Sequence, residues 1–250
     1  MQKRREKITE AVNREGLLTL PQLRALFPHV SDVTLRKDLK WLDEEKHIIR
    51  IHGGAKSIPA TLGTPDTHLM RLQTNLHDKE IIAEKAAAIL QEYSMVYIAP
   101  GSTCYVLAKR LRDIPMQVCT DGLLVANELM RCRRVETTLI GGTVDPLGAR
   151  TMGPSVFETL ARMRFDCAVV GVDGFQCDLG FTHYLEHTNA VCRSLRRRTD
   201  RLVVVMDHSK FGQARPSLIL PTEDVDTVIT DRALPEDVQA RFERAGVEVL

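Results

Sequence analysis

The stretch VSDVTLRKDLKWLDEEKHIIRIHGGA, residues 30–55, joins a basic helix to a short apolar strand that ends in His-Gly-Gly. Ser31 is a favourable N-cap for this helix, because its hydroxyl can accept a hydrogen bond from the first turn. Leu35, Leu39 and Leu42 recur at helical spacing and predict one buried face. The basic side chains are therefore expected on the opposite face, where they can meet a polyanion.

Two shorter helices are expected before the basic helix, with Thr19 as the N-cap of the second. After it, the run HIIRI is extended and Gly53-Gly54 permits a sharp reversal, which predicts a basic hairpin. A helix, a short turn and a second helix can place the second helix in the DNA major groove, with the hairpin on the phosphate backbone. The residues expected to contact DNA are Ser31, Thr34, Arg36, Lys37, Lys40, Arg50 and His52.

Charge is unevenly distributed along the chain of 250 residues. The formal net charge is +1, but residues 1–56 hold 12 Lys and Arg against 8 Asp and Glu. The other residues hold 22 against 25, so the positive excess lies at the N-terminal end and favours a polyanionic partner there. A solvated surface is the common explanation of one basic helix, but it explains less well a helix, a hairpin and a basic start together.

Neither a membrane segment nor a metal site is indicated. No run of about 20 apolar residues exists, and the start MQKRREKITE does not resemble a signal peptide, so a cytoplasmic protein without a membrane partner is expected. The six cysteines form no Cys-x-x-Cys pair. His183 and His187 are four residues apart and could share a helical face, but no third metal ligand accompanies them. No metal and no cofactor are expected, since Gly-x-Gly-x-x-Gly is also missing.

The composition changes after residue 56. Residues 57–75 mix Pro, Gly and Thr with little periodicity, as a linker does. We expect a DNA-binding domain at residues 1–56, a linker at 57–75 and a second domain at 76–250. In the second domain, helical patterns alternate with apolar runs such as SMVYIA, FDCAVVGV and RLVVVMD. This alternation predicts an α/β fold with a mainly parallel sheet covered on both faces.

Glycines and polar side chains follow several of the expected strands. Ligands of parallel sheets bind beyond the carboxyl ends of the strands. Backbone N–H groups and Lys210 could hold a phosphate there, and Asp121 and Asp173 could hold sugar hydroxyls. Each feature alone is more often a turn, a cap or a surface lysine, but their recurrence favours a site for a small phosphorylated polyol. The candidate residues are Gly101, Ser102, Thr103, Asp121, Gly141, Gly142, Asp173, Gly174 and Lys210.

The chain resembles the DeoR family of bacterial transcription regulators over nearly its whole length. Residues 31–39 and 49–55 are similar to the DNA-binding signature of that family, and residues 141–142, 171–174, 180–182 and 207–212 to its effector-domain motifs. The resemblance adds Glu186 to the effector residues. It implies a winged helix-turn-helix followed by an effector domain similar in fold to ribose-phosphate isomerases and coenzyme A transferases. Phosphorylated sugars or related metabolites are the implied effectors.

Two positions depart from the usual pattern of that family. The first strand-end loop of the family commonly reads Asp-Ser-Gly-Thr-Thr, whereas this chain has Ala-Pro-Gly-Ser-Thr at residues 99–103. After the second strand the family commonly has Thr-Asn, and this chain has Thr120-Asp121. One acid is missing and another is present nearby, so we expect the effector to differ from the common ones.

Three functions fit these features. The leading hypothesis is a transcription repressor of a carbohydrate-metabolism operon that binds operator DNA as a dimer or tetramer and responds to a phosphorylated sugar. The second is a sugar-phosphate isomerase or deaminase with Asp121, Asp173 or Glu186 as the general base. The third is a metabolite-binding protein whose helix-turn-helix mediates only protein contacts. The N-terminal module favours the first hypothesis, in which the protein is no enzyme and has no catalytic residue.

Overall fold

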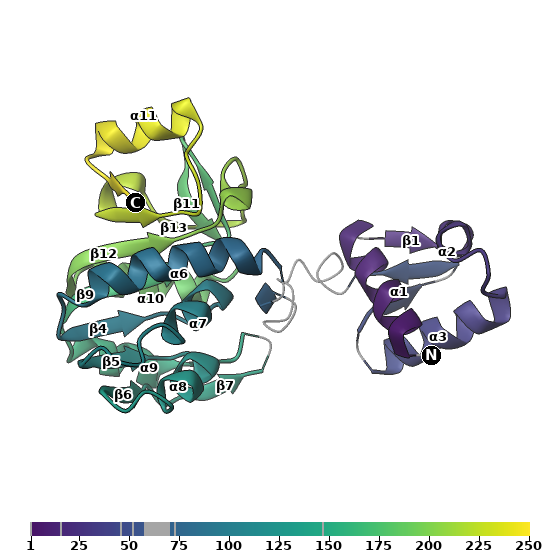
Figure 1. Ribbon diagram of the computed structural model, residues 1–250, viewed down its shortest axis with the longest axis horizontal. Helices are drawn as coiled ribbons and strands as arrows, with labels where there is room; N and C mark the ends of the chain where they lie inside the picture. Colours follow the sequence, from purple (N-terminus) through teal and green to yellow (C-terminus); the bar gives the residue numbers. More distant parts are fainter. Residues whose placement is uncertain are drawn as a thin grey trace. The chain divides into compact units, whose positions relative to one another are not determined.

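The computed structural model describes residues 2–15, 17–45, 47–51, 53–57, 71–72, 74–146 and 148–250. The chain divides into two compact units, Met1–Asp66 and Thr67–Leu250, each of which is described by itself (Figure 1). The domain limits expected at residues 56 and 75 stay predictions, because residues 58–70 lie outside the described part. Among the described residues, no helix has the length and apolar character that a membrane crossing requires.

The N-terminal unit is a winged helix-turn-helix, as expected. Its elements are α1 (Gln2–Glu15), β1 (Leu17–Thr19), α2 (Leu20–Leu26), α3 (Asp32–Glu44), β2 (Ile49–Ile51) and β3 (Gly54–Lys56). Strand β3 pairs antiparallel with both β1 and β2, so β2 and β3 form the expected hairpin after α3. Gly54 is required in this sheet, because a Cβ atom there would lie 2.3 Å from the carbonyl oxygen of Leu18.

Side-chain caps determine where α2 and α3 begin. The Thr19 side chain accepts a hydrogen bond from the backbone N–H of Gln22, and the Gln22 side chain accepts one from the backbone N–H of Thr19. The prediction that Thr19 caps α2 is therefore confirmed. The Ser31 hydroxyl accepts a hydrogen bond from the backbone N–H of Thr34 at 3.2 Å and so caps α3, also as predicted. The three leucines of α3 predicted to be buried are at most 2% exposed.

A buried carboxylate joins α1 to α3. Asp38 is 1% exposed and accepts hydrogen bonds from Arg4 Nε at 2.7 Å and Arg5 Nε at 2.9 Å. Burial raises the pKa of Asp38, but the two arginines outweigh it and hold that pKa below its ordinary value. The Arg5 guanidinium also lies over the ring of Trp41, 4.1 Å from its centroid. Part of the basic N-terminal segment is therefore structural.

The C-terminal unit is built on a seven-stranded sheet with the order β15-β14-β12-β9-β4-β5-β6. Every neighbouring pair in this sheet is parallel, which confirms the predicted fold class. The strands are β4 (Met95–Ile98), β5 (Met116–Thr120), β6 (Val135–Leu139), β9 (Phe165–Gly171), β12 (Thr199–Val205), β14 (Thr227–Ile229) and β15 (Glu248–Val249). Residues 168–170 and 203–205 of β9 and β12 are at most 1% exposed, because helices cover both faces of the sheet.

Helices alternate with most of these strands, as the sequence predicts, although the helix at residues 186–196 was not among the expected helices. They are α6 (Leu76–Leu90), α7 (Ser102–Ala108), α8 (Leu123–Leu129), α9 (Pro154–Ala161), α10 (Glu186–Arg196) and α11 (Glu236–Ala245), with short 3-10 turns at His208–Lys210 and Thr222–Asp224. In Figure 1, α6 and α7 lie in front of the sheet and α10 lies behind it. Helix α7 contacts both α6 and α8, whereas α9 contacts α10.

Two smaller antiparallel sheets were not predicted. The hairpin of β7 (Thr143–Asp145) and β8 (Arg150–Met152) follows β6, and β10 (Gly174–Gln176), β11 (Gly180–His183) and β13 (Ser217–Leu220) form a separate three-stranded sheet. Phe175 of β10 packs with its ring centroid 4.8 Å from those of both Phe181 and Phe242, which attaches this sheet to α11.

His183 ends β11 and His187 lies in α10, so the two imidazoles do not share a helical face.

We expect Asp38→Ala to destabilise the N-terminal unit by about 2 kcal/mol, because it leaves two partly buried guanidinium groups without their carboxylate. Trp41 is the one tryptophan of the chain, so its fluorescence reports urea unfolding of this unit in the full-length protein. The lowered pKa of Asp38 means that its contribution is present above the ordinary Asp pKa and is lost as the pH falls through the folded value. An unchanged urea midpoint, equal to that of the control Glu45→Ala at the exposed C-cap of the same helix, would contradict this role.

Candidate functional site

The outer face of α3 carries unneutralised positive charge. Arg36, Lys37 and Lys40 are exposed, and Val33 beside them is 65% exposed. Lys40 Nζ lies 3.6 Å from Glu44 Oε1 one turn away. Arg36 and Lys37 have no ion-pair partner among the described residues. A guanidinium and an ammonium group on an exposed helix can thus reach phosphates or base edges without first breaking an ion pair.

The other residues expected to contact DNA surround this face. The hydroxyls of Ser31 and Thr34 lie 2.9 Å apart at the N-terminus of α3, so capping already holds both. Arg50 is exposed on β2, and its backbone N–H donates to Asp43 Oδ1 at 2.8 Å, which attaches the hairpin to α3. His52 lies outside the described residues. The DNA contacts of all seven residues stay predictions.

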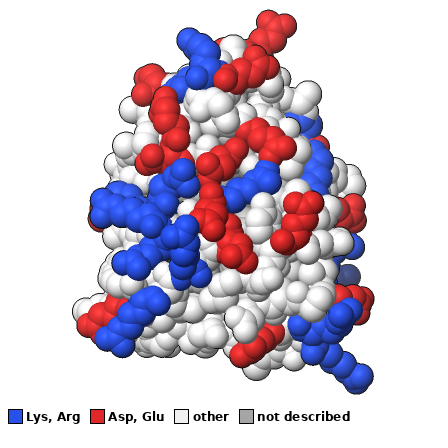
Figure 2. All heavy atoms as spheres, turned by 90° about the vertical axis from the view of Figure 1, so that its left-hand side faces the viewer, with Lys and Arg blue, Asp and Glu red and all other residues white. Residues whose placement is uncertain are grey.

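The surface of the C-terminal unit has a different charge pattern. Figure 2 shows a face of that unit on which Lys and Arg side chains are mixed with Asp and Glu. Opposite charges at such spacing largely cancel beyond the Debye length, about 8 Å at physiological salt. That face therefore has no uniform positive charge.

The parallel sheet brings the expected effector residues to one edge. Because all its strands run in one direction, the loops that follow them lie along the same edge of the sheet. Residues 101–103 follow β4, Asp121 follows β5, residues 141–142 follow β6, Asp173 and Gly174 follow β9, and Lys210 follows β12. Glu186 stands apart from these loops as the first residue of α10. Effector binding by these residues stays a prediction.

Asp173 is the centre of a buried network at this edge. It is 4% exposed, forms an ion pair with Arg71, and places Oδ2 3.0 Å from His183 Nε2. Its backbone carbonyl accepts a hydrogen bond from Arg215 Nε at 3.1 Å. Burial raises the pKa of Asp173, but Arg71, His183 and Lys210 outweigh it and hold that pKa below its ordinary value. Asp173 is therefore a carboxylate at neutral pH.

His183 is a neutral partner of this carboxylate. Burial lowers its pKa to about 4, against the opposing effect of Asp173. Its Nδ1 atom accepts a hydrogen bond from the backbone N–H of Leu185 at 3.0 Å. In the neutral ring the proton is consequently on Nε2, which faces Asp173.

Asp121 is more deeply enclosed than its place after a strand suggests. It is 1% exposed, and its Oδ1 atom accepts a hydrogen bond from the Tyr97 hydroxyl at 2.5 Å. Burial raises the pKa of Asp121, and the Tyr97 hydrogen bond and Arg150 offset that rise only in part. One carboxylate oxygen that was expected to hold a sugar hydroxyl is thus already used inside the protein.

Three cations beside these acids escaped the sequence predictions. Arg71 and Lys79 lie in and beyond a segment interpreted as a linker, and Arg150 lies on the unpredicted strand β8. Lys79 is 4% exposed and donates to the carbonyl oxygens of Arg71 and Thr74. Burial lowers the pKa of Lys79 to about 8. Motif spacing could not reveal these residues, because the fold brings them together from distant parts of the chain.

Asn75 connects the start of α6 to the loop after β12. Its amide Nδ2 donates to Asp207 Oδ1 at 3.2 Å and to the Ser209 hydroxyl at 3.3 Å. Burial raises the pKa of Asp207, but Lys210 and the hydrogen bonds from Ser209 and Asn75 outweigh it and lower that pKa. Lys210 is partly buried, and its ammonium group makes no hydrogen bond within the described part of the chain. Its charge lowers the pKa of both Asp207 and Asp173.

Glu186 has contacts of its own. Its carboxylate accepts hydrogen bonds from the Ser217 hydroxyl at 2.6 Å, Arg193 Nη2 at 2.6 Å and Asn189 Nδ2 at 3.0 Å. These three bonds, with that of Ser217 the largest contribution, lower the pKa of Glu186 to about 2. A carboxylate with so low a pKa is a weak base at neutral pH.

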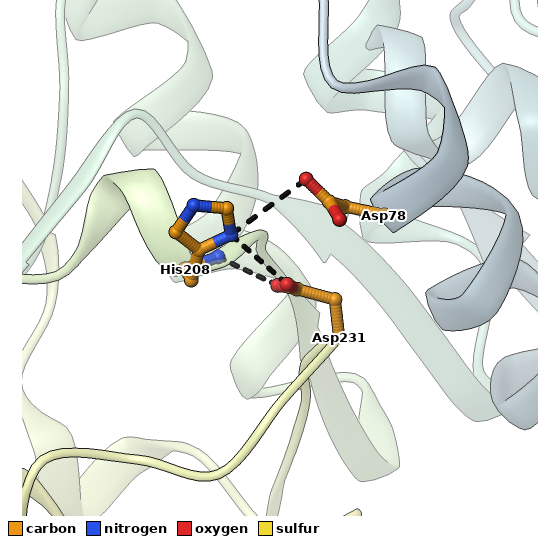
Figure 3. A group of neighbouring side chains, drawn as sticks. All are labelled: Asp78, His208 and Asp231. Atoms are coloured by element: carbon orange, nitrogen blue, oxygen red, sulfur yellow. Dashed lines mark hydrogen bonds and ion pairs between the residues drawn. The ribbon is translucent and has the colours of Figure 1, made fainter.

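A second charged group lies beside the loop after β12. Figure 3 shows His208 between two carboxylates, with Nδ1 2.9 Å from Asp231 Oδ2 and 3.7 Å from Asp78 Oδ2. Arg232 neutralises the same acids, since its Nε lies 2.8 Å from Asp231 Oδ2 and its Nη2 lies 3.5 Å from Asp78 Oδ1. The group is an ion-pair network that joins α6 to the loops after β12 and β14, rather than a set of carboxylates that awaits a cation.

Comparison with known proteins gives matches for both units. Residues 4–61 match the family described as DeoR-like helix-turn-helix domain, and residues 74–232 match the DeoR C terminal sensor domain. The HTH-type transcriptional regulator GolR of Listeria innocua is 29% identical over 98% of this chain and 96% of its own length. The glycerol-3-phosphate regulon repressor of Escherichia coli is 29% identical over 94% of this chain and 92% of its own length.

Solved structures resemble this chain only distantly. The β subunit of eIF2B from Chaetomium thermophilum has a TM-score of 0.48 and 12% identity, over 68% of this chain and 54% of that one. Ribose 5-phosphate isomerase A from Neisseria gonorrhoeae has a TM-score of 0.40 and 16% identity, over 55% of this chain and 54% of that one.

His183 predicts a pH dependence of stability. Its pKa is about 4 in the folded state against an ordinary value of 6.5, so the unfolded chain binds the proton more readily. Folding stability of the C-terminal unit should therefore fall by about 3 kcal/mol as the pH drops from 7 to 4, through this group alone. Urea unfolding followed by circular dichroism at both pH values measures it. The variant His183→Gln should lose that part of the pH dependence, and an identical dependence in the variant would refute the assignment.

Proposed function

Because the chain belongs to the DeoR family of transcription regulators, we propose that it represses a carbohydrate operon and leaves its operator when a phosphorylated sugar binds. The observation that carries the proposal is the exposed basic face of α3 beside the β2–β3 hairpin, in a unit with its own core. The acids and cations at the sheet edge belong to the other compact unit. One unit can thus contact DNA while the other senses a metabolite.

In this proposal the side chains of α3 enter the major groove. Arg36 and Lys37 contact base edges or phosphates, Lys40 contacts a phosphate, and Thr34 lies at the helix N-terminus, where the dipole favours an anion. Arg50 and His52 on the hairpin contact the neighbouring backbone, and Ser31 fixes the start of the helix. Phosphate contacts supply affinity and base contacts supply sequence preference.

The effector is a small phosphorylated sugar or polyol. Its phosphate binds Lys210 and the backbone N–H groups of residues 101–103, and its hydroxyls bind Asp173 and the loops that contain residues 141–142 and Gly174. The glycerol-3-phosphate regulon repressor, named for a phosphorylated polyol, supports this class of ligand. Glu186 and Asp121 act at the margin of the site, since their carboxylates are already hydrogen-bonded.

The protein acts as a homo-oligomer in the cytoplasm, where operator DNA is found. Operators with two half-sites favour two-fold symmetric assemblies, so a dimer or a tetramer of this chain is expected. Ligand binding would shift the population of DNA-binding arrangements of such an assembly.

An isomerase or deaminase is the weaker alternative. A general base needs a free carboxylate with a pKa close to the working pH. Glu186 has a pKa of about 2, Asp173 is held in an ion pair with Arg71, and Asp121 accepts the Tyr97 hydroxyl. We therefore assign these carboxylates to ligand binding and structure, and no catalytic role to them.

Fluorescence anisotropy with the DNA upstream of the gene tests the proposal. Arg36→Ala should weaken operator binding about tenfold and lower the slope of log affinity against log salt by about one, because one phosphate contact is lost. The matched control Arg133→Ala removes an exposed arginine from the C-terminal unit and should leave both values unchanged. Equal affinities of the two variants would count against α3 as the DNA-binding helix.

The same assay with a panel of sugar phosphates tests the sensing function. Release of the operator by one compound, at unchanged salt, is the expected result. Binding that does not prefer the operator over random DNA of equal length would refute sequence-specific repression.

A further inference from the structure

We propose that the effector carries a second anionic group, a carboxylate or a second phosphate, which binds Arg150. This inference rests on the proposed sensing function and narrows its ligand class. The phosphate ester of an uncharged polyol has one anionic group, which is the phosphate. The structure offers two separate cations for an anion at the carboxyl edge of the sheet, Lys210 after β12 and Arg150 on β8.

Arg150 is a buried cation with few partners. Its side chain is 7% exposed, although a guanidinium has five N–H donors to satisfy. Nη1 donates to the neutral hydroxyl of Thr188 at 2.7 Å. The Asp145 carboxylate is 3.5 Å from Nε, too far for a good hydrogen bond, and Nε has no hydrogen-bond partner within the described residues. Such a group stays costly until an acceptor reaches it.

Asp121 does not supply that acceptor. The two residues are adjacent, because the backbone N–H of Thr151 donates to the carbonyl of Asp121 at 2.8 Å and Gly122 forms a bridge with Arg150. The Asp121 carboxylate nevertheless takes its hydrogen bond from Tyr97. Burial raises its pKa, and the Tyr97 hydrogen bond and Arg150 offset that rise only in part. The loop at residues 99–103 also lacks the acid that the family commonly has there.

The position of Arg150 fits the far end of an elongated ligand. Lys210 follows β12 and Arg150 lies beside the loop after β5, with β9 and β4 between them. Three strand spacings amount to roughly 14 Å, and the two long side chains shorten the gap from both sides. Arg71 forms an ion pair with Asp173, whose second carboxylate oxygen faces His183, and the charges of Arg71 and Arg150 both lower the pKa of that imidazole. A ligand held by Asp173 through its hydroxyls can thus reach a cation at each end.

The structural alternative is that Arg150 only closes the β7–β8 hairpin through Asp145. In that case a second charge on the ligand would bring no gain, and loss of the guanidinium would affect stability alone. The two explanations differ in what they predict for ligand preference.

Matched pairs of ligands, tested on the full-length wild-type protein, distinguish these two explanations of Arg150. The pairs are ribose 5-phosphate with 5-phosphoribonate, glycerol 3-phosphate with 3-phosphoglycerate, and fructose 6-phosphate with fructose 1,6-bisphosphate. Each pair adds one anionic group to the same carbon skeleton, and the pairs distinguish a carboxylate from a second phosphate. We expect the doubly anionic member of at least one pair to release operator DNA at a concentration roughly tenfold to a hundredfold lower.

Variants then assign the preference to Arg150. Arg150→Gln should abolish it, so that both members of a pair release DNA at similar concentrations. Thr188→Val keeps the charge, removes its hydrogen bond and should reduce the preference by a few fold, which provides a test if Arg150→Gln does not fold. Arg162→Gln, an exposed arginine on the C-terminal side of α9, is the matched control and should keep the full preference.

Ligand-induced shifts in Tm, measured without DNA, distinguish a failure of this inference from a failure of the proposed repressor function. Equal responses to both members of every pair, or a preference that persists in Arg150→Gln, would overturn the inference and leave the repressor function standing. Tm shifts that favour the doubly anionic ligand would support it even if no operator binding were found. If no compound shifts Tm or releases DNA, the sensing function fails and this inference fails with it.

Discussion

Parallel pairing of seven strands is the constraint on which the C-terminal unit depends. It places the connections between strands on both faces of the sheet, so residues 168–170 of β9 and 203–205 of β12 are buried. It also collects the loops after β4, β5, β6, β9 and β12 along one edge. Residues separated by more than a hundred positions, such as Arg71 and Asp173, therefore meet there. Charge that would be dilute along the sequence becomes a dense group of acids and cations.

Elements with strong periodicity or a clear cap could be predicted from the sequence. The basic helix begins at the residue after Ser31 and buries its leucines, and the predicted runs SMVYIA and FDCAVVGV contain β4 and β9. The strands β7, β8, β10, β11 and β13 could not be predicted, because they are three or four residues long and too short to show an alternation. Helix α10 was also missed, since the polar run before its apolar positions resembles a loop. Because the start of α10 was not predicted, the sequence also did not show that His183 lies on β11 and His187 on α10.

In the candidate sites too, some residues could be predicted from the sequence and others could not. Residues that follow a strand or face outward on a helix are recognisable from local pattern, and the structure places them at the sheet edge and on the outer face of α3. Arg71, Lys79, Arg150 and His183 are not recognisable in this way, since tertiary contacts bring them there. Local pattern also does not show that Asp121 is enclosed by Tyr97, or that Arg4 and Arg5 pair with a buried carboxylate. Position in sequence reveals which residues are near a site, whereas burial and partners decide what they do.

The ion pairs of Asp38 with Arg4 and Arg5 affect how the protein should be prepared for binding measurements. The counterions of a carboxylate buried in α3 come from α1, 34 and 33 residues earlier in the sequence. A chain shortened past Arg5 would keep its helix-turn-helix sequence intact and yet place an unpaired charge under α3. Preparations of this protein should therefore be checked for an intact N-terminus before a loss of DNA binding is attributed to the residues that face the groove.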